Sequence, residues 1–191
     1  MLFSNNGRIR RKTCVDGNIE EVQHLLTNNP DLNLNCGDSS EWKKTPFYIV
    51  CQEGYLNIVE LLLSDERVDV NKPENLVNAT SFGIACFYGH IEVVKLLLSD
   101  GRVDLNATTK YDETAFYIAC EKGQIEIVKL LLNNEKVDIT STNNPGPFYL
   151  ACREGHFGIV KLLLNDERVD VNEGNEPYDH TAFYCLSTRA L

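Results

Sequence analysis

The sequence contains seven cysteines, which are its most obvious candidates for reactive side chains. Cysteines can act as metal ligands or as redox-active thiols. A zinc site needs closely spaced cysteines and histidines, and the sequence has neither a Cys-x-x-Cys pair nor a Cys/His cluster. Five of the seven recur instead at one long period, at Cys14, Cys51, Cys86, Cys120 and Cys152. Cys36 and Cys185 lie outside this series. We expect Cys36 in an exposed loop, as the candidate reactive thiol.

The histidines and carboxylates do not form a recognisable catalytic set. The four histidines are scattered along the chain, at His24, His90, His156 and His180. The sequence lacks His-Glu-x-x-His, Gly-x-Ser-x-Gly and a glycine-rich phosphate loop followed by lysine. Carboxylates recur with the long period, as at Asp65-Glu66 and Asp166-Glu167, which is typical of a solvated face. We therefore expect no catalytic residue, no metal and no cofactor, and a protein that is not an enzyme.

The overall charge bears on the class of partner. The formal net charge is −10 and the calculated isoelectric point is near 4.8. Such a chain is poorly suited to nucleic acid or to an anionic membrane, and its acidity favours a basic partner.

We find no secretory signal and no apolar run long enough to cross a bilayer. A cytoplasmic location is expected, with a nuclear one as the alternative. The basic cluster from Arg8 to Lys12 is either a localisation signal or a solvated helix face.

The elements that position these residues come from an internal repeat. Three residues after each cysteine of the series stands a glycine, and a valine and a leucine run follow at fixed offsets. The glycines lie 32 to 37 residues apart, at Gly17, Gly54, Gly89, Gly123 and Gly155. This agreement at one period predicts five copies of one structural unit.

Each unit is predicted to form two helices, as the copy from Thr114 to Leu132 illustrates. Thr114 is a suitable N-cap for a first helix that extends to about Lys122, and Gly123 can end it in the left-handed conformation. A second helix is predicted over Ile125–Leu132, with its apolar face made by Ile125, Val128, Leu131 and Leu132. The Val-Asp-Val-Asn connector that follows most copies alternates apolar and polar residues, which predicts a short extended arm.

The combined motifs resemble those of the ankyrin-repeat family. Thr45 to Gly54 is similar to the family's first-helix signature, and Ile58 to Leu63 resembles its second-helix signature. The resemblance covers about residues 13–187. It implies an all-α solenoid of stacked helix-turn-helix units with β-turn finger loops, and it places the cysteine series at small core positions. The sequence departs from the family at Tyr48 and its equivalents, where the family has histidine.

We predict a single domain over residues 1–191. Its repeats are placed at about 8–37, 38–73, 74–108, 109–141 and 142–173, with a partial sixth at 174–191. The outermost copies are expected to act as caps. Because the sixth copy has no second helix, one alternative is a regulatory or targeting fragment of a larger ankyrin-containing enzyme or channel. Another alternative is a redox or metal protein that uses the cysteine series.

The resemblance also implies where a partner binds. Ankyrin proteins bind partners on a concave face made by finger loops and first helices. Carried over to this sequence, the finger positions are Trp42, Lys44, Leu76, Val77, Lys110, Tyr111 and Tyr178. The first-helix positions are Gln52, Glu53, Phe87, Tyr88, Glu121, Lys122, Arg153 and Glu154. We expect a monomer that binds a protein of unknown identity, centred on an aromatic patch of Trp42, Tyr88 and Tyr111.

Overall fold

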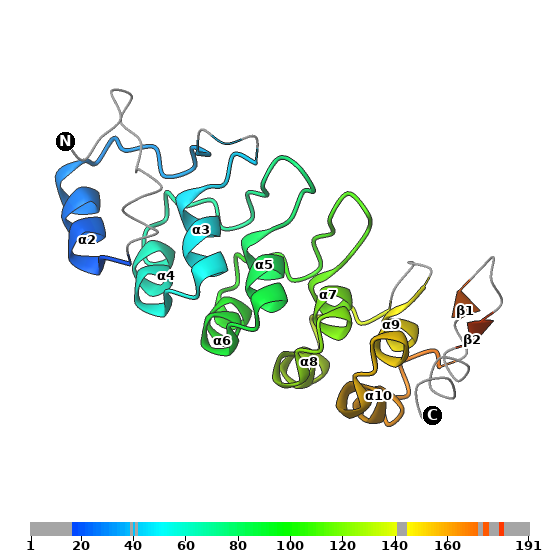
Figure 1. Ribbon diagram of the computed structural model, residues 1–191. Coiled ribbons are helices and arrows are strands. Elements are labelled where there is room, and N and C mark those ends of the chain that lie inside the picture. The colour runs from blue at the N-terminus through cyan, green and yellow to red at the C-terminus, as the bar shows by residue number, and fades with distance from the viewer. Residues whose placement is uncertain are drawn as a thin grey trace. The chain divides into compact units, whose positions relative to one another are not determined.

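The computed structural model describes residues 17–38, 40, 42–140, 145–171, 174–175 and 180–181, and the regular secondary structure within them is almost entirely helical (Figure 1). The helices are α2 (Ile19–Asn28), α3 (Pro46–Glu53), α4 (Leu56–Leu63), α5 (Ser81–Tyr88), α6 (Ile91–Ser99), α7 (Ala115–Glu121), α8 (Ile125–Leu132), α9 (Pro147–Glu154) and α10 (Phe157–Leu163). A short antiparallel pair joins β1 (Gly174–Asn175) to β2 (His180–Thr181). The all-α prediction is confirmed, with this pair as an addition to it.

The chain divides into two compact units, Met1–Asp104 and Leu105–Leu191. In the first unit α3 and α4 form one helical hairpin and α5 and α6 the next, while α3 packs on α5 and α4 packs on both α2 and α6. In the second unit α7/α8 and α9/α10 are the hairpins, with α7 on α9 and α8 on α10. Each unit is therefore a stack of hairpins with a layer of first helices and a layer of second helices. The single-domain prediction stays a prediction.

Local signals set the ends of the first helices. The hydroxyls of Thr45, Thr80 and Thr114 accept bonds of 3.1 to 3.2 Å from the amide three residues on, as predicted for N-caps. The helix α9 begins instead with Pro147 after Gly146, without a side-chain cap. Gly54 and Gly89 end α3 and α5 with φ angles of 75° and 79°, where a side chain would be strained.

The buried face of the second helices differs from the prediction. In α8 the buried residues are Ile127, Val128 and Leu131, whereas Ile125 and Leu132 are half-buried. The predicted face is wrong at these positions because α8 packs against α7 on one side and α10 on another. Contact with two neighbours needs a wide apolar face, so two successive residues are buried.

The cysteine series lies in the core. Cys51, Cys86, Cys120 and Cys152 are fully buried, and Cys14 and Cys185 lie outside the described residues. Burial raises the pKa of the Cys51 and Cys86 thiols far above the ordinary value, which keeps them protonated and unreactive. Cys36 is half-buried rather than exposed as predicted, since its loop folds back and places Gly37 against the backbone of Lys43.

The connectors between hairpins are held by asparagine side chains. Asn71 donates from Nδ2 to the carbonyl of Arg102 (2.7 Å), and its Oδ1 accepts from the amide of Asp104 (2.8 Å). Asn35 and Asn106 make the equivalent pairs of bonds to the hairpin that follows each of them. Val68 and Val70 are buried while Asp69 is exposed, as the alternation predicts, but these residues form no strand. The predicted alternation of burial is confirmed, and asparagine amides take the place of a sheet partner for this arm.

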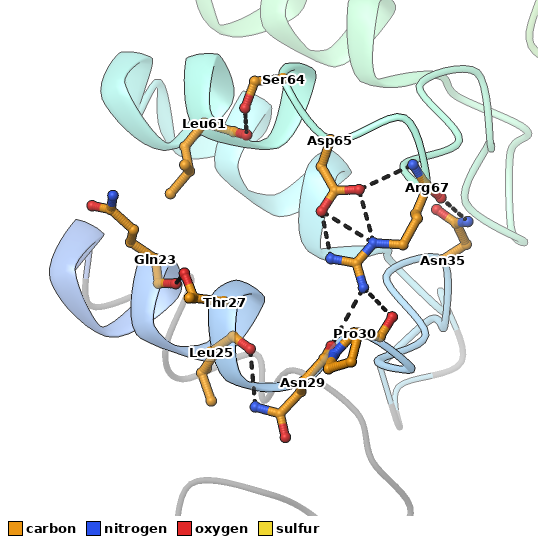
Figure 2. Close-up of polar contacts among 10 residues, drawn as sticks. All are labelled: Gln23, Leu25, Thr27, Asn29, Pro30, Asn35, Leu61, Ser64, Asp65 and Arg67. Carbon is orange, nitrogen blue, oxygen red and sulfur yellow. Dashed lines mark hydrogen bonds and ion pairs between the residues drawn. The ribbon is translucent and has the colours of Figure 1, made fainter.

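Arginine side chains reinforce the same junctions. Figure 2 shows the Arg67 guanidinium between the carboxylate of Asp65 and the carbonyls of Asn29 and Pro30, at the end of the preceding α2. Arg102 bonds Asp100 and the carbonyl of Leu63 (2.6 Å) in the same way. A planar guanidinium can serve a carboxylate and a helix-end carbonyl at once, which ties each turn to the hairpin before it.

Candidate functional site

Finger loops precede the first helices, and the same backbone hydrogen bond closes them. In the three finger loops before α3, α5 and α7, the first residue of the loop donates its amide to the carbonyl of the residue before the capping threonine. The bonds are Asp38 to Lys44 (2.9 Å), Glu74 to Ala79 (3.0 Å) and Thr109 to Glu113 (3.0 Å). A non-glycine residue with positive φ stands two positions before each capping threonine, at Lys43 (46°), Asn78 (62°) and Asp112 (62°). The fingers are thus defined turns of differing length.

The buried side chain of Glu74 holds the second finger loop in place. Its side chain is only 1% exposed, and its carboxylate accepts bonds from the amides of Leu76 (2.7 Å), Val77 (2.7 Å) and Ala79 (3.1 Å). The backbone dipoles balance the buried charge and hold the tip of the loop in one conformation. Sequence reasoning missed this role because nothing in the repeat pattern marks Glu74.

The first and second fingers are joined through their backbones. The amide of Asn75 donates to the carbonyl of Trp42 over 2.7 Å. Leu76 follows Asn75, so its side chain belongs to the finger segment that lies against Trp42. Both side chains remain exposed, at 40% for Trp42 and 42% for Leu76.

Lys44 connects the first finger to the helix α3. Its Nζ donates to Oε1 of Gln52 over 2.6 Å. The same ammonium lies 5.2 Å from the ring centroid of Trp42 and 5.4 Å from that of Tyr48. Cation–π contacts of this length hold the lysine stem and the Trp42 ring in place.

A second chain of contacts orients the aromatic residues at the end of α5. His90 Nε2 bonds the carbonyl of Gln52 over 2.8 Å, and the His90 ring stacks on Tyr88 with centroids 6.1 Å apart. Phe87 packs edge-on against Tyr88 at 5.0 Å. Burial raises the pKa of Tyr48, and the Glu74 carboxylate and Tyr88 raise it further. Contacts therefore run without a break from Trp42 through Lys44, Gln52 and His90 to Tyr88 and Phe87. The four exposed apolar residues Trp42, Leu76, Phe87 and Tyr88 are called the aromatic surface below.

The predicted site residues of the second unit have a different character. Glu121 pairs with Lys122 (2.9 Å), and Arg153 pairs with Glu154 (2.8 Å). Tyr111 is 60% exposed and lies beneath the ammonium of Lys110, 5.1 Å from its ring centroid. Most of these side chains are charged and form an ion pair with the adjacent residue in the sequence. The predicted site residues of the first unit are mostly apolar.

The structure brings some of the predicted residues together and leaves others apart. Trp42, Lys44, Gln52, Phe87 and Tyr88 belong to the contact chain described above. The Glu53 carboxylate accepts a bond from Nε2 of the Gln52 side chain, and Val77 is half-buried and donates its backbone amide to the Glu74 carboxylate. Tyr111 belongs to the other unit, and Tyr178 lies outside the described residues. The patch of Trp42, Tyr88 and Tyr111 stays a prediction.

Sequence reasoning also missed exposed apolar residues on the second helices. Phe157 opens α10 with 60% of its surface exposed, and Leu164 follows that helix with 49% exposed. The equivalent Ile125 and Leu132 are half-buried. The repeat pattern could not separate these cases, because the residue types match and only the neighbours differ.

Among the residues that the structure describes, no group of three or more His, Cys, Asp or Glu side chains could hold a metal ion. None of the helices described is long and apolar enough to cross a membrane.

Stacked hairpins with capping threonines, αL glycines and finger loops define a tandem helical-repeat protein. A family model described as ankyrin repeats (3 copies) matches residues 12–109 and 82–175. The chain therefore belongs to the ankyrin-repeat family, as the sequence motifs predicted. No curated protein matches the chain.

Proposed function

We propose that this protein is a non-catalytic interaction module that binds a partner protein through finger loops and first helices. Ankyrin repeats generally mediate protein–protein interaction, and that coarser function follows from the family. The observation that supports the finer proposal is the aromatic surface. Large aromatic side chains that are exposed and held in place are characteristic of binding hot spots.

The position of this surface within the first unit supports the proposal further. Among the described residues of that unit, Ile19 is the one other large apolar side chain counted as exposed, and it lies at the start of α2. The rings of Trp42 and Tyr88 are fixed by Lys44 and His90, which reduces the ordering cost of binding.

The free, buried thiols of Cys51 and Cys86 support a reducing compartment such as the cytoplasm.

An affinity capture with matched variants tests the proposal. Wild type, Trp42→Ala/Tyr88→Ala and Phe157→Ala/Leu164→Ala are compared as baits in lysate of the native cell. The second variant removes exposed apolar surface from the α10 region instead of the fingers, so it controls for general stickiness. We expect a partner that is kept by the α10 variant and lost by the finger variant, with both variants folded by circular dichroism. Equal capture by the finger variant and wild type would contradict the proposed surface.

A further inference from the structure

The asparagine ties between hairpins are present at three positions and missing at the fourth. Asn35, Asn71 and Asn106 each bond a carbonyl and an amide of the turn that follows the next second helix. Thr140 is the equivalent residue of the connector between α8 and α9. Its hydroxyl donates instead to Asp138 Oδ1 (2.6 Å), within the same connector. In the described part of the chain, Thr140 makes no hydrogen bond to the α9/α10 hairpin or to the turn after it.

The backbone at Thr140 has the same local turn as the backbone at Asn71. The Thr140 amide donates to Asp138 Oδ1 over 2.9 Å, and the Asn71 amide donates to Asp69 Oδ1 over 3.1 Å. Only the side chain differs between the two connectors. A carboxamide reaches two separate backbone groups with its NH₂ and its oxygen, whereas a hydroxyl offers a single atom.

A pocket lies at the missing tie. Its volume is about 110 Å³, and it lies between Thr140 and the turn at Arg168–Asp170, with Phe116 and Pro147 also in its wall. Atoms that face an unfilled space lose packing contacts on that side. The connector and the turn are therefore held together less tightly here than at the asparagine junctions.

The α9/α10 hairpin keeps two other polar ties. His156 Nε2 bonds a carbonyl at the end of α7 (2.9 Å), and Arg168 donates to a carbonyl at the end of α8 (2.8 Å). The α5/α6 hairpin has the same two ties through His90 and Arg102, and the Asn71 tie in addition. The α9/α10 hairpin is thus docked in the same way with one tie fewer.

Local support within the α9/α10 hairpin is also weaker. The helix α9 begins with Pro147 after Gly146, without a side-chain cap, whereas a threonine caps α7. In α10, Gly158 stands where α8 has Glu126, which pairs with Lys129 (2.7 Å). A glycine inside a helix favours the unfolded chain, because it has more backbone freedom to lose on folding.

We propose that the α9/α10 hairpin opens as a unit, detaching from α7/α8 while α7 and α8 stay folded. The stability of a repeat stack is the sum of repeat and interface contributions, so the weakest interface sets where it opens first. The hairpin carries Arg153 and Glu154, two first-helix positions expected to contact a partner, so opening withdraws them from that surface. The opening itself does not depend on the proposed function.

Hydrogen exchange of the full-length protein, followed by mass spectrometry at pH 7, tests the proposal. We expect the amides of α9 and α10 to be protected at least about tenfold less than those of α7 and α8. Thr140→Asn supplies the missing carboxamide and should raise the protection of α9 and α10 about tenfold, a factor typical of one or two net hydrogen bonds. The protection of α3 and α4 should change less than about twofold in this variant.

Thr140→Ala is the matched control. It removes a hydroxyl that bonds only its own connector, so the protection of α9 and α10 should stay within about twofold of wild type. A gain in this variant as large as that of Thr140→Asn would show that the carboxamide is not the cause, and would contradict the proposal.

Three further outcomes would overturn the proposal. One is equal protection of α7, α8, α9 and α10 in the wild type. Another is weak protection of α9 and α10 that Thr140→Asn leaves unchanged, because the weakness would then follow from the place of the hairpin in the stack. The third is a gain spread evenly over α3 to α10, which would mean that the hairpin opens only with the whole chain. The aromatic surface is tested separately, by capture with Trp42→Ala/Tyr88→Ala.

Discussion

Glu74 is a buried carboxylate held by backbone amides, and this arrangement predicts a large effect of its removal. Glu74→Ala should lower the free energy of unfolding by about 2–3 kcal/mol, because three amides lose a charged acceptor. Glu74→Gln keeps one acceptor oxygen and should cost less. Urea denaturation of both variants measures the effect, with exposed Glu60→Ala as the control. A loss for Glu74→Ala no larger than that for Glu60→Ala would contradict the role assigned to Glu74.

Aspartates of the hairpin turns predict a pH dependence of stability. The hydrogen bond from Arg102 lowers the pKa of Asp100 below its ordinary value, and Arg67 and Arg168 do the same for Asp65 and Asp166. A carboxyl with a lowered folded-state pKa contributes stability above its unfolded pKa of about 3.9, and the contribution is lost as pH falls through the folded value.

Asp100→Asn isolates one of these pairs. It should be less stable than wild type at pH 7. The difference should shrink as the pH falls below about 4, where the unfolded-state carboxyl takes up its proton, and should be lost once the pH falls below the lowered folded-state pKa. Urea midpoints from pH 7 to pH 2.5 measure it, with Glu60→Gln as the matched control. A difference that does not change with pH would show that Asp100 acts by shape alone.

At the scale of elements, glycines that end the first helices are predicted to be irreplaceable. Gly54 has φ 75°, and a Cβ there would meet the His90 ring that bonds α3. Gly54→Ala should therefore cost at least about 1–2 kcal/mol and displace His90 from the Gln52 carbonyl. Gly101→Ala is the control, since Gly101 has no positive φ and no atom within 4 Å of the added carbon. Thermal unfolding of the two variants distinguishes them, and equal stabilities would contradict the prediction.

The helices could be predicted from sequence because their signals are local. A threonine cap, an αL glycine and the leucine run lie within a few residues of the element they define. The second helix predicted over Ile125–Leu132 has those bounds, and the first ends at Glu121, one residue before the predicted Lys122. The burial of Ile127 could not be predicted in the same way, because it depends on two neighbouring helices.

The positions of the candidate site residues could be predicted from the sequence, but the partners of their charged side chains could not. The repeat pattern placed Trp42, Phe87 and Tyr88 on fingers and first helices, where the structure leaves them exposed. It gave no means to tell that Lys122 is paired with an acid while Lys44 is bonded to Gln52. Which charges are satisfied depends on side-chain neighbours across loops, which a period in the sequence does not specify.

At the scale of the whole molecule, the charge is strongly negative. The net charge is −10, and the cations of the first unit that form ion pairs, Arg67, Lys95 and Arg102, lie on second helices or the turns that follow them. A partner at long range meets this net charge. A basic partner is therefore attracted at a distance, and an acidic one is repelled.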